Sequence, residues 1–525
     1  MNKIKQEYLN TWQSAYKKLN QKQREAVDTI DGPVMVIAGP GTGKTQLLAV
    51  RIGNILLNTD VFPHNILCLT YTDAGATAMR ERLTSFIGPD AYNVNFFTFH
   101  AFCNSVISEN PQYFGDFKAL QLVSDIELVE ILRTVFDNLA DEHPLKKLKG
   151  NEYNELNKLK QLFTIMKQEE WTSAYIHSKY EEYKEFVLDP ERSNCIWRVN
   201  RDGFKKGDIN PRLVNEALSK YTKLLGASEE LESYKKIMTE RERFDFQDMI
   251  LWVIEKFQQH DELLAKYQER YQYILVDEYQ DTNGSQNNLL FLLSDFWEKP
   301  NLFIVGDDDQ SIFRFQGANM NSIMEFKDKY QPKEIVLTEN YRSSQVILDS
   351  ASKLIENNLD RLSHKYPDLD KNLTEHRSVK PEFSPEPQFL AYQNFVQEEA
   401  GIIEKIISLN NQGVAWKDIA IIYSKHRVVE DMVKYLTQKK IPLNVRKRVN
   451  VLYEPEVEKI LKILEYLSIE SKRPHYAEDI LFEILHYHFW ELDPYEIAMI
   501  ALKCRHKDEN NPEDENAGTR EIPFS

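Results

Sequence analysis

One glycine-rich stretch of the sequence has the residue types and spacing to bind a phosphate chain. The stretch "AGPGTGKT" follows the apolar segment "PVMVI" and precedes a helical pattern. Backbone N–H groups at the start of a helix attract phosphate oxygens, so this context predicts a nucleotide-binding loop. In such a loop Lys44 reaches the β- and γ-phosphates, and the Thr45 hydroxyl helps to hold Mg²⁺. The loop residues are Ala38, Gly39, Pro40, Gly41, Thr42, Gly43, Lys44 and Thr45.

The loop departs from its usual pattern at Ala38, where most such loops have glycine. Gly39 and Gly41 supply backbone flexibility, so the departure leaves the prediction in place. The alternative interpretation is a glycine-rich turn that joins a strand to a helix and binds nothing. The strand before the loop and the helix after it are the context that phosphate binding requires, and they favour the nucleotide site.

A pair of adjacent carboxylates follows another apolar segment. In "YILVDEYQD" the side chains of Asp277 and Glu278 stand at the end of a predicted strand. A carboxylate at Asp277 can hold the Mg²⁺ shell, and one at Glu278 can polarise the water that attacks the γ-phosphate. The alternative is a solvated strand edge. Together with the phosphate loop, the pair predicts an ATPase that uses ATP and Mg²⁺.

A third stretch, "FIVGDDDQSIFRFQGAN", joins a buried strand to three consecutive carboxylates and two aromatic rings. Its simplest interpretation is a strand end, an acidic turn and rings that return to the core, because aromatic rings are mostly interior. The neighbouring motifs favour another interpretation, in which Asp307 to Asp309 mark the nucleotide side of a functional segment. Asp308 and Asp309 have the alternative role of ordering the turn.

The composition limits the kind of protein that carries these motifs. The chain has 525 residues, of which 42% are hydrophobic, so we expect three or four domains with ordinary cores. Its net charge is −17, so any contact with nucleic acid must be local. No apolar run reaches the roughly 20 residues of a membrane span and no secretory signal opens the chain, which predicts a soluble, cytoplasmic protein. The four cysteines are scattered, without the spacing of zinc or disulfide sites.

The elements that must position these motifs have the pattern of parallel α/β domains. Strand-like segments "PVMVIAG", "NILCLTYT" and "VNFFTFH" alternate with helical ones, and "YQYILVDE" and "NLFIVGD" resume the pattern after a long, charged helical stretch. A second α/β unit is predicted to begin at "KEIVLTENYRSS" and to continue through "PQFLAY" and "DIAIIYS". The final stretch, "DENNPEDENAGTREIPFS", is typical of a loop or a disordered tail.

Seven motifs, in this order, resemble those of superfamily 1 DNA helicases of the UvrD, PcrA and Rep type. They are "LNQKQREAV", "AGPGTGKT", "LTYTDAGATAMRERL", "FTFHAF", "VDEYQD", "VGDDDQSIFRFQGA" and "LTENYRSS". The resemblance implies an α/β fold with two RecA-like, parallel-sheet motor domains of the P-loop NTPase class, each with a helical insertion. The predicted parts are a first motor domain at 1–114 and 244–331, a helical accessory insertion at 115–243, the N-terminal part of a second motor domain at 332–470, and the start of a second helical accessory domain with an acidic tail at 471–525.

The resemblance also gives roles to residues outside the phosphate loop. It implies that Gln23 reads the adenine edge, that Tyr341 stacks on the adenine, and that Arg342 reaches the γ-phosphate. It further implies that Gln310 senses the γ-phosphate and that Phe315 stacks on a base of single-stranded DNA. Without the resemblance, Gln23 would be a surface amide on a charged helix. The implied catalytic residues are Lys44, Asp277, Glu278, Gln310 and Arg342, and the implied metal ligands are Thr45 and Asp277.

The implied DNA contacts of the first motor domain depend on Thr70, Tyr71 and His100. Tyr71 stands where the family usually has Phe, and Asp73 where it usually has Asn, so a carboxylate there would repel a phosphate backbone. His100 has the alternative role of a core histidine bonded to a backbone carbonyl. At the nucleotide, Gln46 belongs to the implied cofactor-binding set, although a relative has at that position an arginine that packs on the adenine.

Two functions remain open from the sequence. The first is an ATP-dependent DNA helicase or translocase that moves 3′→5′ on single-stranded DNA, as a monomer at single strands and single-strand/duplex junctions, in repair or replication. The second is a non-motor module that binds ATP and single-stranded DNA without productive turnover. The family's C-terminal motifs, which include a second catalytic arginine, are not found before Ser525. We therefore expect an incomplete second motor domain and weak or absent turnover by this chain alone.

Overall fold

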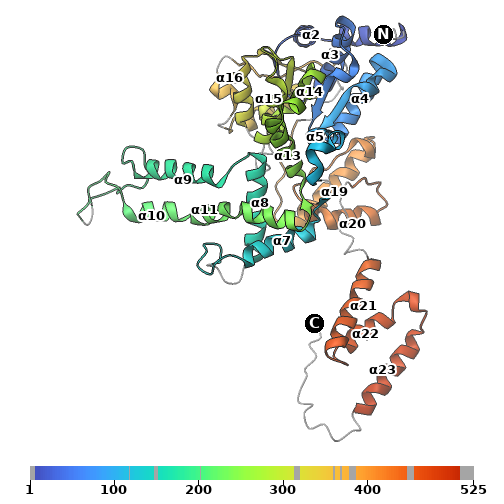
Figure 1. Ribbon diagram of the computed structural model, residues 1–525. Helices are drawn as coiled ribbons and strands as arrows, with labels where there is room; N and C mark the ends of the chain where they lie inside the picture. Colours follow the sequence, from blue (N-terminus) through green and yellow to red (C-terminus); the bar gives the residue numbers. More distant parts are fainter. Residues whose placement is uncertain are drawn as a thin grey trace. The chain divides into compact units, whose positions relative to one another are not determined.

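The computed structural model describes most of the chain (Figure 1). The described residues are 6–117, 119–146, 152–200, 203–311, 320–358, 361–366, 369–377, 386–445 and 455–508. They fall into two compact units, Met1–Gln388 and Phe389–Ser525. None of the helices in these ranges is long and apolar enough to cross a membrane.

The first unit is built on one parallel sheet of six strands. The strands lie in the order β3-β2-β6-β7-β1-β8, and every neighbouring pair is parallel. The strands are β1 (Val34–Ala38), β2 (Ile66–Thr70), β3 (Asn95–Thr98), β6 (Tyr273–Val276), β7 (Leu302–Gly306) and β8 (Lys333–Leu337). The four inner strands are buried almost throughout, as expected when helices cover both faces of a parallel sheet.

Two hydrophobic cores fill the space between the sheet and its helices. One face packs against α3 (Lys44–Asn58) and α4 (Asp73–Ile87). The opposite face packs against α5 (Phe99–Glu109), α13 (Phe246–Gln259) and α15 (Gly284–Ser294). Successive strand residues point to alternate faces, so each inner strand contributes to both cores.

Three predicted functional segments leave the same edge of the sheet. The phosphate loop follows β1, Asp277 and Glu278 follow β6, and the turn that begins at Asp307 follows β7. These strands are neighbours in the order β6-β7-β1. Because the carboxyl ends of parallel strands share an edge, segments far apart in the sequence meet there, at the usual ligand-binding edge of such sheets.

A helical segment lies between two short strands that pair with each other, β4 (Gln121–Leu122) and β5 (Arg243–Phe244). Most of its helices share a core of their own. In Figure 1, α9 runs beside α10 and α11 as an arm. The helices are α7 (Asp125–Asp137), α8 (Glu152–Gln168), α9 (Ser173–Leu188), α10 (Pro211–Ser219), α11 (Thr222–Glu229) and α12 (Leu231–Glu240).

A buried ion cluster joins this helical segment to the helices of the sheet. Near the end of α8, the Nζ of Lys167 lies 2.8 Å from Asp245 Oδ2 and 2.7 Å from Asp248 Oδ1, and the lysine side chain is 1% exposed. Asp245 also caps α13 by accepting hydrogen bonds from backbone N–H groups of its first turn. Burial by itself opposes the charged ammonium, but the two carboxylates raise the pKa of Lys167, so the lysine is charged.

We expect Lys167→Met to destabilise the first unit by about 3–5 kcal/mol, because it leaves two carboxylates buried without their cation. Lys179→Met is the matched control, since Lys179 forms an exposed ion pair with Glu182, and such pairs contribute little to stability. Urea unfolding followed by tryptophan fluorescence measures both. Equal unfolding midpoints for the two variants would contradict an anchoring role for Lys167.

The strand predicted to open a second α/β unit is instead the edge strand of the first sheet. β8 carries the "KEIVL" residues and pairs in parallel with β1 along its whole length. An apolar pattern identifies a strand without saying which sheet it joins, and this explains the difference. After β8 the chain forms β9 (Glu339–Asn340), which pairs with β10 (Thr374–Glu375), and then α17 (Gln345–Ile355).

The second unit contains helices but no strand in its described residues. The segments "PQFLAY" and "DIAIIYS", predicted as strands, are irregular there, and Phe389 and Ile422 are each 96% exposed. A strand is stable only beside another that satisfies its N–H and C=O groups, so apolar sequence alone does not make a sheet. The main helices are α19 (Phe395–Asn411), α20 (Glu430–Gln438), α21 (Pro455–Lys472), α22 (Glu478–Leu485) and α23 (Pro494–Asp508).

Candidate nucleotide-binding site

The phosphate loop joins the end of β1 to the first turn of α3. Gly41 and Gly43 have φ angles of +73° and +87°, a left-handed conformation that glycine adopts without strain. Thr42 is fully buried, and its hydroxyl donates to the carbonyl of Gly39 over 2.8 Å, which fixes the shape of the loop. Gly43 is the N-terminal cap of α3, where the helix dipole favours a phosphate group.

The lysine of the loop forms an ion pair with the second carboxylate of "VDEYQD". Lys44 Nζ lies 2.7 Å from Glu278 Oε2, and the lysine side chain is 12% exposed. Glu278 has a φ of +49°, which is uncommon for residues other than glycine. Strained backbone of this kind is concentrated at functional sites. The turn directs the Glu278 carboxylate toward the phosphate loop.

Asp277, like Glu278, is half-buried. Its backbone N–H donates to the carbonyl of Leu69 on β2, and its Oδ1 accepts from the backbone N–H of Glu278 over 3.0 Å. Burial, reinforced by the charge of Glu278 and opposed by Lys44, raises the pKa of Asp277 to about 6. Burial also raises the pKa of Asp281 to about 6, and its buried Oδ1 has no hydrogen-bond partner within the described ranges. Carboxylates that are buried with little positive charge nearby favour the binding of a cation.

The two predicted magnesium ligands have suitable chemistry. Mg²⁺ prefers oxygen ligands and is usually held by one or two carboxylates together with substrate phosphates. Asp277 supplies a carboxylate at the end of β6, and its raised pKa indicates that a nearby positive charge would stabilise its ionised form. Thr45 is exposed on the first turn of α3, and its side chain supplies a hydroxyl oxygen. These donors fit a magnesium ion that binds together with phosphate oxygens.

Gln23 and Tyr341 are connected through one asparagine. Asn20 caps α2 (Gln21–Asp28) by accepting from the backbone N–H of Gln23, and its Nδ2 donates to the Tyr341 hydroxyl over 3.0 Å. Gln23 is 4% exposed, and its Nε2 donates to the carbonyl of Thr42 over 2.8 Å. It is therefore not the surface amide of the alternative interpretation. The geometry brings both predicted adenine-binding residues to one side of the phosphate loop.

The segment after β8 packs directly on the phosphate loop. The backbone N–H of Tyr341 donates to the carbonyl of Gly41 over 2.9 Å, and Asn340 Nδ2 donates to the carbonyl of Pro40 over 2.5 Å. A Cβ atom on Gly41 would lie 2.7 Å from Asn340 Nδ2 and 2.8 Å from Arg342 Cβ. Only glycine at position 41 leaves room for Asn340 and Arg342 to lie this close to the phosphate loop, and their closeness places Arg342 beside the loop.

The turn after β7 places Gln310 at the same edge. In the short 3-10 helix η5 (Asp308–Gln310), Gln310 Nε2 donates to Asp307 Oδ2 over 2.8 Å. The backbone N–H of Asp307 donates to Gln280 Oε1 over 3.0 Å, and Gln280 Nε2 donates to Glu278 Oε2 over 2.9 Å. Gln280 is 1% exposed. A continuous set of hydrogen bonds therefore joins the predicted water-activating carboxylate to the predicted γ-phosphate sensor.

Family comparisons add to this geometry. The model of the UvrD/REP helicase N-terminal domain matches residues 19–331, and the model of the UvrD-like helicase C-terminal domain matches residues 335–475. The chain belongs to the UvrD/Rep helicase family. The expected α/β, RecA-like fold is confirmed by this membership together with the parallel sheet.

Curated relatives of this UvrD/Rep-type chain carry the name ATP-dependent DNA helicase PcrA. The protein of Staphylococcus aureus (strain Mu50) is 29% identical over 418 residues, which are 79% of this chain and 49% of that protein. The protein of Leuconostoc citreum is 29% identical over 457 residues, which are 86% of this chain and 52% of that protein. This chain thus spans about half the length of the curated relatives it matches.

The residues expected to face DNA in a UvrD/Rep-type protein lie at the ends of β2 and β3, which pair with each other. Thr70 is buried and its hydroxyl donates to the carbonyl of Thr72, whereas Tyr71 is 40% exposed. The ring of His100 packs edge-on against Phe246, and burial lowers its pKa, so it is neutral at pH 7. The DNA-facing role of His100 and its alternative as a core histidine both stay open.

UvrD/Rep-type proteins usually have Asn at the position of Asp73, and the structure explains why a carboxylate is suitable there. Asp73 is the first residue of α4, whose cap is Thr72. A negative side chain in the first turn of a helix interacts favourably with the helix dipole. Gln46 stands where a relative has an arginine, and its side chain accepts a hydrogen bond from Arg82 Nη1 over 2.5 Å. An arginine from α4 therefore lies beside this position.

Phe315 lies outside the described residues, in the segment 312–319, and its stacking role stays a prediction. The elements on either side of that segment are both tied to the turn after β6. Gln280, in that turn, accepts from the backbone of Asp307 before the segment. Tyr279, which is 1% exposed, donates to the carbonyl of Ser322 over 3.3 Å, in α16 (Met320–Tyr330) after it.

Four residues of the site were missed by reasoning from the sequence. Asn20 and Gln280 lie inside quoted motifs but received no role, although the spacing from Asn20 to Gln23 is that of a capping box. Arg361 and Lys371 lie outside every motif and contact the Asp307 turn. Consecutive carboxylates that are buried or half-buried require nearby cations, so the sequence indicates that such partners exist but does not identify them.

Proposed function

We propose that this chain is the ATP-binding and ATP-hydrolysing part of a DNA helicase that moves 3′→5′ on single-stranded DNA. The observation that carries the proposal is the meeting of three distant segments. Lys44, Glu278 and the segment that contains Arg342 all lie at the phosphate loop. Family membership and the names of the relatives support a DNA helicase as the activity to which this site contributes.

Nucleotide binding in this proposal changes the partner of one lysine. The Lys44 ammonium pairs with Glu278, and phosphate oxygens would replace that carboxylate as its partner. Glu278 then keeps the hydrogen bond from Gln280 and is released from its cation. The exchange frees the Glu278 oxygen that Lys44 contacts, so that this oxygen can accept a hydrogen bond from the attacking water.

The other groups divide the remaining tasks. Gln23 and Tyr341 bind the adenine, for which the Gln23 amide exchanges its hydrogen bond to the Thr42 carbonyl for the base edge. Arg342 stabilises the charge that spreads over the transferred phosphoryl oxygens. Thr45 and Asp277 would hold a magnesium ion, which would neutralise part of the phosphate charge.

The test is a DNA-dependent assay of the full 525-residue chain. We expect weak ATP hydrolysis that single-stranded DNA stimulates and that Glu278→Gln lowers further, and we expect any unwinding to occur on a duplex that has a 3′ single-stranded tail. A duplex with a 5′ tail and a blunt duplex are the controls. Unwinding from the 5′ tail alone would contradict the direction. Binding of ATP and single-stranded DNA without any hydrolysis would favour the non-motor module.

Phe315→Ala should weaken the binding of single-stranded DNA by about 1–3 kcal/mol with little dependence on sequence, because stacking of a base on an aromatic ring contributes about that much. ATP affinity should be nearly unchanged. Fluorescence anisotropy with two oligonucleotides of different sequence measures the DNA affinity, and Phe296→Ala, at an exposed ring, is the matched control.

Thermal melting separates this role from a core position of Phe315. Truncation of a core phenylalanine costs about 3–5 kcal/mol of stability. A large loss of stability in Phe315→Ala with intact DNA affinity would therefore return the segment to its simplest interpretation, a turn whose rings pack in the core.

A further inference from the structure

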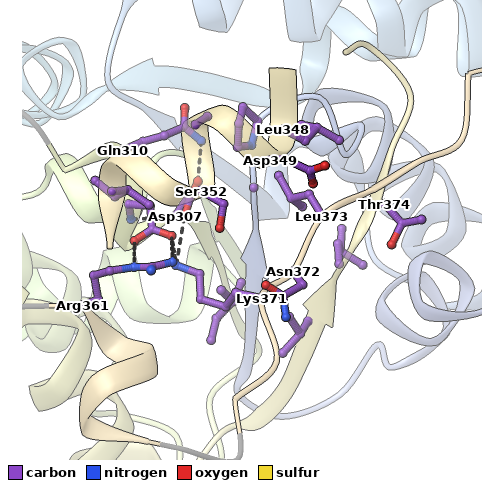
Figure 2. Close-up of a pocket in the computed structure, with 18 of the residues that line it drawn as sticks. Asp307, Gln310, Leu348, Asp349, Ser352, Arg361, Lys371, Asn372, Leu373 and Thr374 are labelled. Atoms are coloured by element: carbon purple, nitrogen blue, oxygen red, sulfur yellow. Dashed lines mark hydrogen bonds and ion pairs between the residues drawn. The ribbon is translucent and has the colours of Figure 1, made fainter. Parts of the chain in front are cut away.

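Three consecutive carboxylates lie together at the turn after β7, two of them buried and the third half-buried. The side chains of Asp307 and Asp308 are 2% and 0% exposed, and that of Asp309 is 19% exposed. Two cations reach them from the stretch that follows α17. Lys371 Nζ contacts all three carboxylates and lies 3.2 Å from Asp307 Oδ1 and 3.0 Å from Asp309 Oδ2. Arg361 donates to both carboxylate oxygens of Asp309, over 2.8 and 2.9 Å. Figure 2 shows Arg361 and Lys371 pointing toward this turn.

The side chains of Asp308 and Asp309 bind the stretch that follows α17, while Asp307 Oδ1 accepts from the backbone N–H of Asp309 within the turn. Asp308 Oδ2 accepts from the backbone N–H of Leu362, next to Arg361. Asp307 has a different environment, because one oxygen faces Lys371 and the other accepts from Gln310 Nε2. Lys371 and the amide of Gln310 are therefore held by the same carboxylate.

The stretch that carries Lys371 also contacts the phosphate loop. Leu373, two residues later, lies so close to Gly39 that a Cβ there would be 2.9 Å from a Leu373 methyl carbon. Gly39, Gln310, Lys371 and Leu373 line one cavity of about 550 Å³ (Figure 2). One short stretch of chain thus touches both the loop that would hold the phosphates and the turn that would sense them.

We propose that Lys371 is a positioning residue for ATP turnover, which acts through the carboxylate of Asp307 to orient the amide of Gln310. This inference rests on the proposed ATPase function. An ionised Asp307 can only accept hydrogen bonds, so it selects the orientation in which Gln310 Nε2 faces it, whereas a protonated Asp307 can also donate to the Gln310 carbonyl oxygen. Without Lys371, the remaining cation, Arg361, is bonded to Asp309 and not to Asp307. Asp307 then binds a proton more easily, and a protonated Asp307 no longer fixes which way the amide points.

The charges around Asp307 set the direction of the pH effect. Burial raises the pKa of Asp307, Asp308 and Asp309 on the same turn add to the rise, and Lys371 and the Gln310 hydrogen bond oppose it. Arg361, on the stretch after α17, acts mainly on Asp309, whose pKa it lowers together with Lys371 against the effect of burial. Removal of Lys371 raises the pKa of Asp307 further. When the pH is lowered, the variant therefore loses activity at a higher pH than the wild type does.

The experiment measures DNA-stimulated ATP hydrolysis by the full chain. Loss of an outer residue that orients a functional group typically costs about 10- to 100-fold, so we expect Lys371→Met to lower kcat by that factor. The KM for ATP and the affinity for a fluorescent ATP analogue should stay within about twofold, because the phosphate loop is intact. Lys371→Arg should restore most of kcat. Lys329→Met, which removes an exposed ion pair with Asp295, is the matched control and should behave as the wild type.

The pH profile supplies a readout that general destabilisation does not move. The acidic limb of kcat should shift to higher pH in Lys371→Met and stay in place in Lys329→Met. If wild-type kcat is measurable and Lys371→Met leaves kcat and the acidic limb unchanged, this inference is overturned and the proposed function stands. If the wild type, with DNA, hydrolyses no ATP, both are overturned.

A double variant keeps the test decisive if Lys371→Met does not fold. The variant with both Asp307→Asn and Lys371→Met removes one buried negative charge along with the cation, and circular dichroism reports whether it folds. If Lys371 acts through Asp307, its kcat should equal that of Asp307→Asn alone. A further loss in the double variant, beyond that of Asp307→Asn, would show that Lys371 acts by another route and would overturn the inference.

Discussion

Glu278→Gln should lower DNA-stimulated ATP turnover by about 10²- to 10⁴-fold while ATP stays bound, because a general base matters mainly when the water attacks. The Lys44–Glu278 ion pair sharpens this expectation. Glutamine competes less than glutamate for the Lys44 ammonium, so ATP affinity should be equal to that of the wild type or higher. A fluorescent ATP analogue measures affinity, and phosphate release measures turnover.

Lys44→Ala is the matched comparison and should have the opposite pattern. Its ammonium makes charge-assisted contacts with phosphate in both the ground state and the transition state, so its loss should weaken ATP binding by about 1.5–3 kcal/mol. Equal ATP affinity in the wild type and in Lys44→Ala would remove the basis for the assignment of the phosphate loop.

Arg342→Ala should reduce kcat by about 10³- to 10⁵-fold with a small change in ATP affinity, the range that an arginine at the transferred phosphoryl group contributes in related chemistry. The structure brings Arg342 close to the phosphate loop, because the backbone N–H of Tyr341 donates to the carbonyl of Gly41 and the Arg342 Cβ lies against the same glycine. Arg342→Lys keeps the charge but not the planar fork, so it should recover part of the activity. Single-turnover measurements of phosphate release test both variants.

Arg270→Ala is the control for the loss of an arginine charge, since Arg270 pairs with Glu109 at the surface. It should leave turnover unchanged. If Arg342→Ala behaves like Arg270→Ala, the arginine that stabilises the phosphoryl charge must come from elsewhere in the protein.

Local sequence was sufficient for the parts of the site whose geometry is local. The phosphate loop needs a strand, glycines and a helix start in direct succession, and the sequence contains all three between Val34 and Lys44. Asp277 and Glu278 come directly after the last residue of β6, so recognition of the strand in the sequence also places these two carboxylates. Their strained turn, with Glu278 at a positive φ, has no signal in residue type, because glutamate has no preference for that conformation.

Contacts between distant residues were not predictable in the same way. Lys371 lies 62 to 64 residues from the carboxylates that it contacts, and no motif marks it. The strand "KEIVL" was recognised as a strand but assigned to the wrong sheet, because strand pairing depends on the other strands available and not on its own pattern. The segments "PQFLAY" and "DIAIIYS" have strand propensity without a partner strand.

The pairing of β8 with β1 limits how far Tyr341, the tyrosine proposed to bind adenine, can travel. β8 is held in the sheet as far as Leu337, and Tyr341 is the fourth residue after it. Four residues of fully extended chain reach about 13–14 Å at 3.3–3.6 Å each. Tyr341 is therefore on a short tether whose fixed end is hydrogen-bonded to the strand that carries the phosphate loop. Any opening that moves α17 and the residues beyond it must therefore keep Tyr341 within this distance of the end of β8, however far the later residues travel.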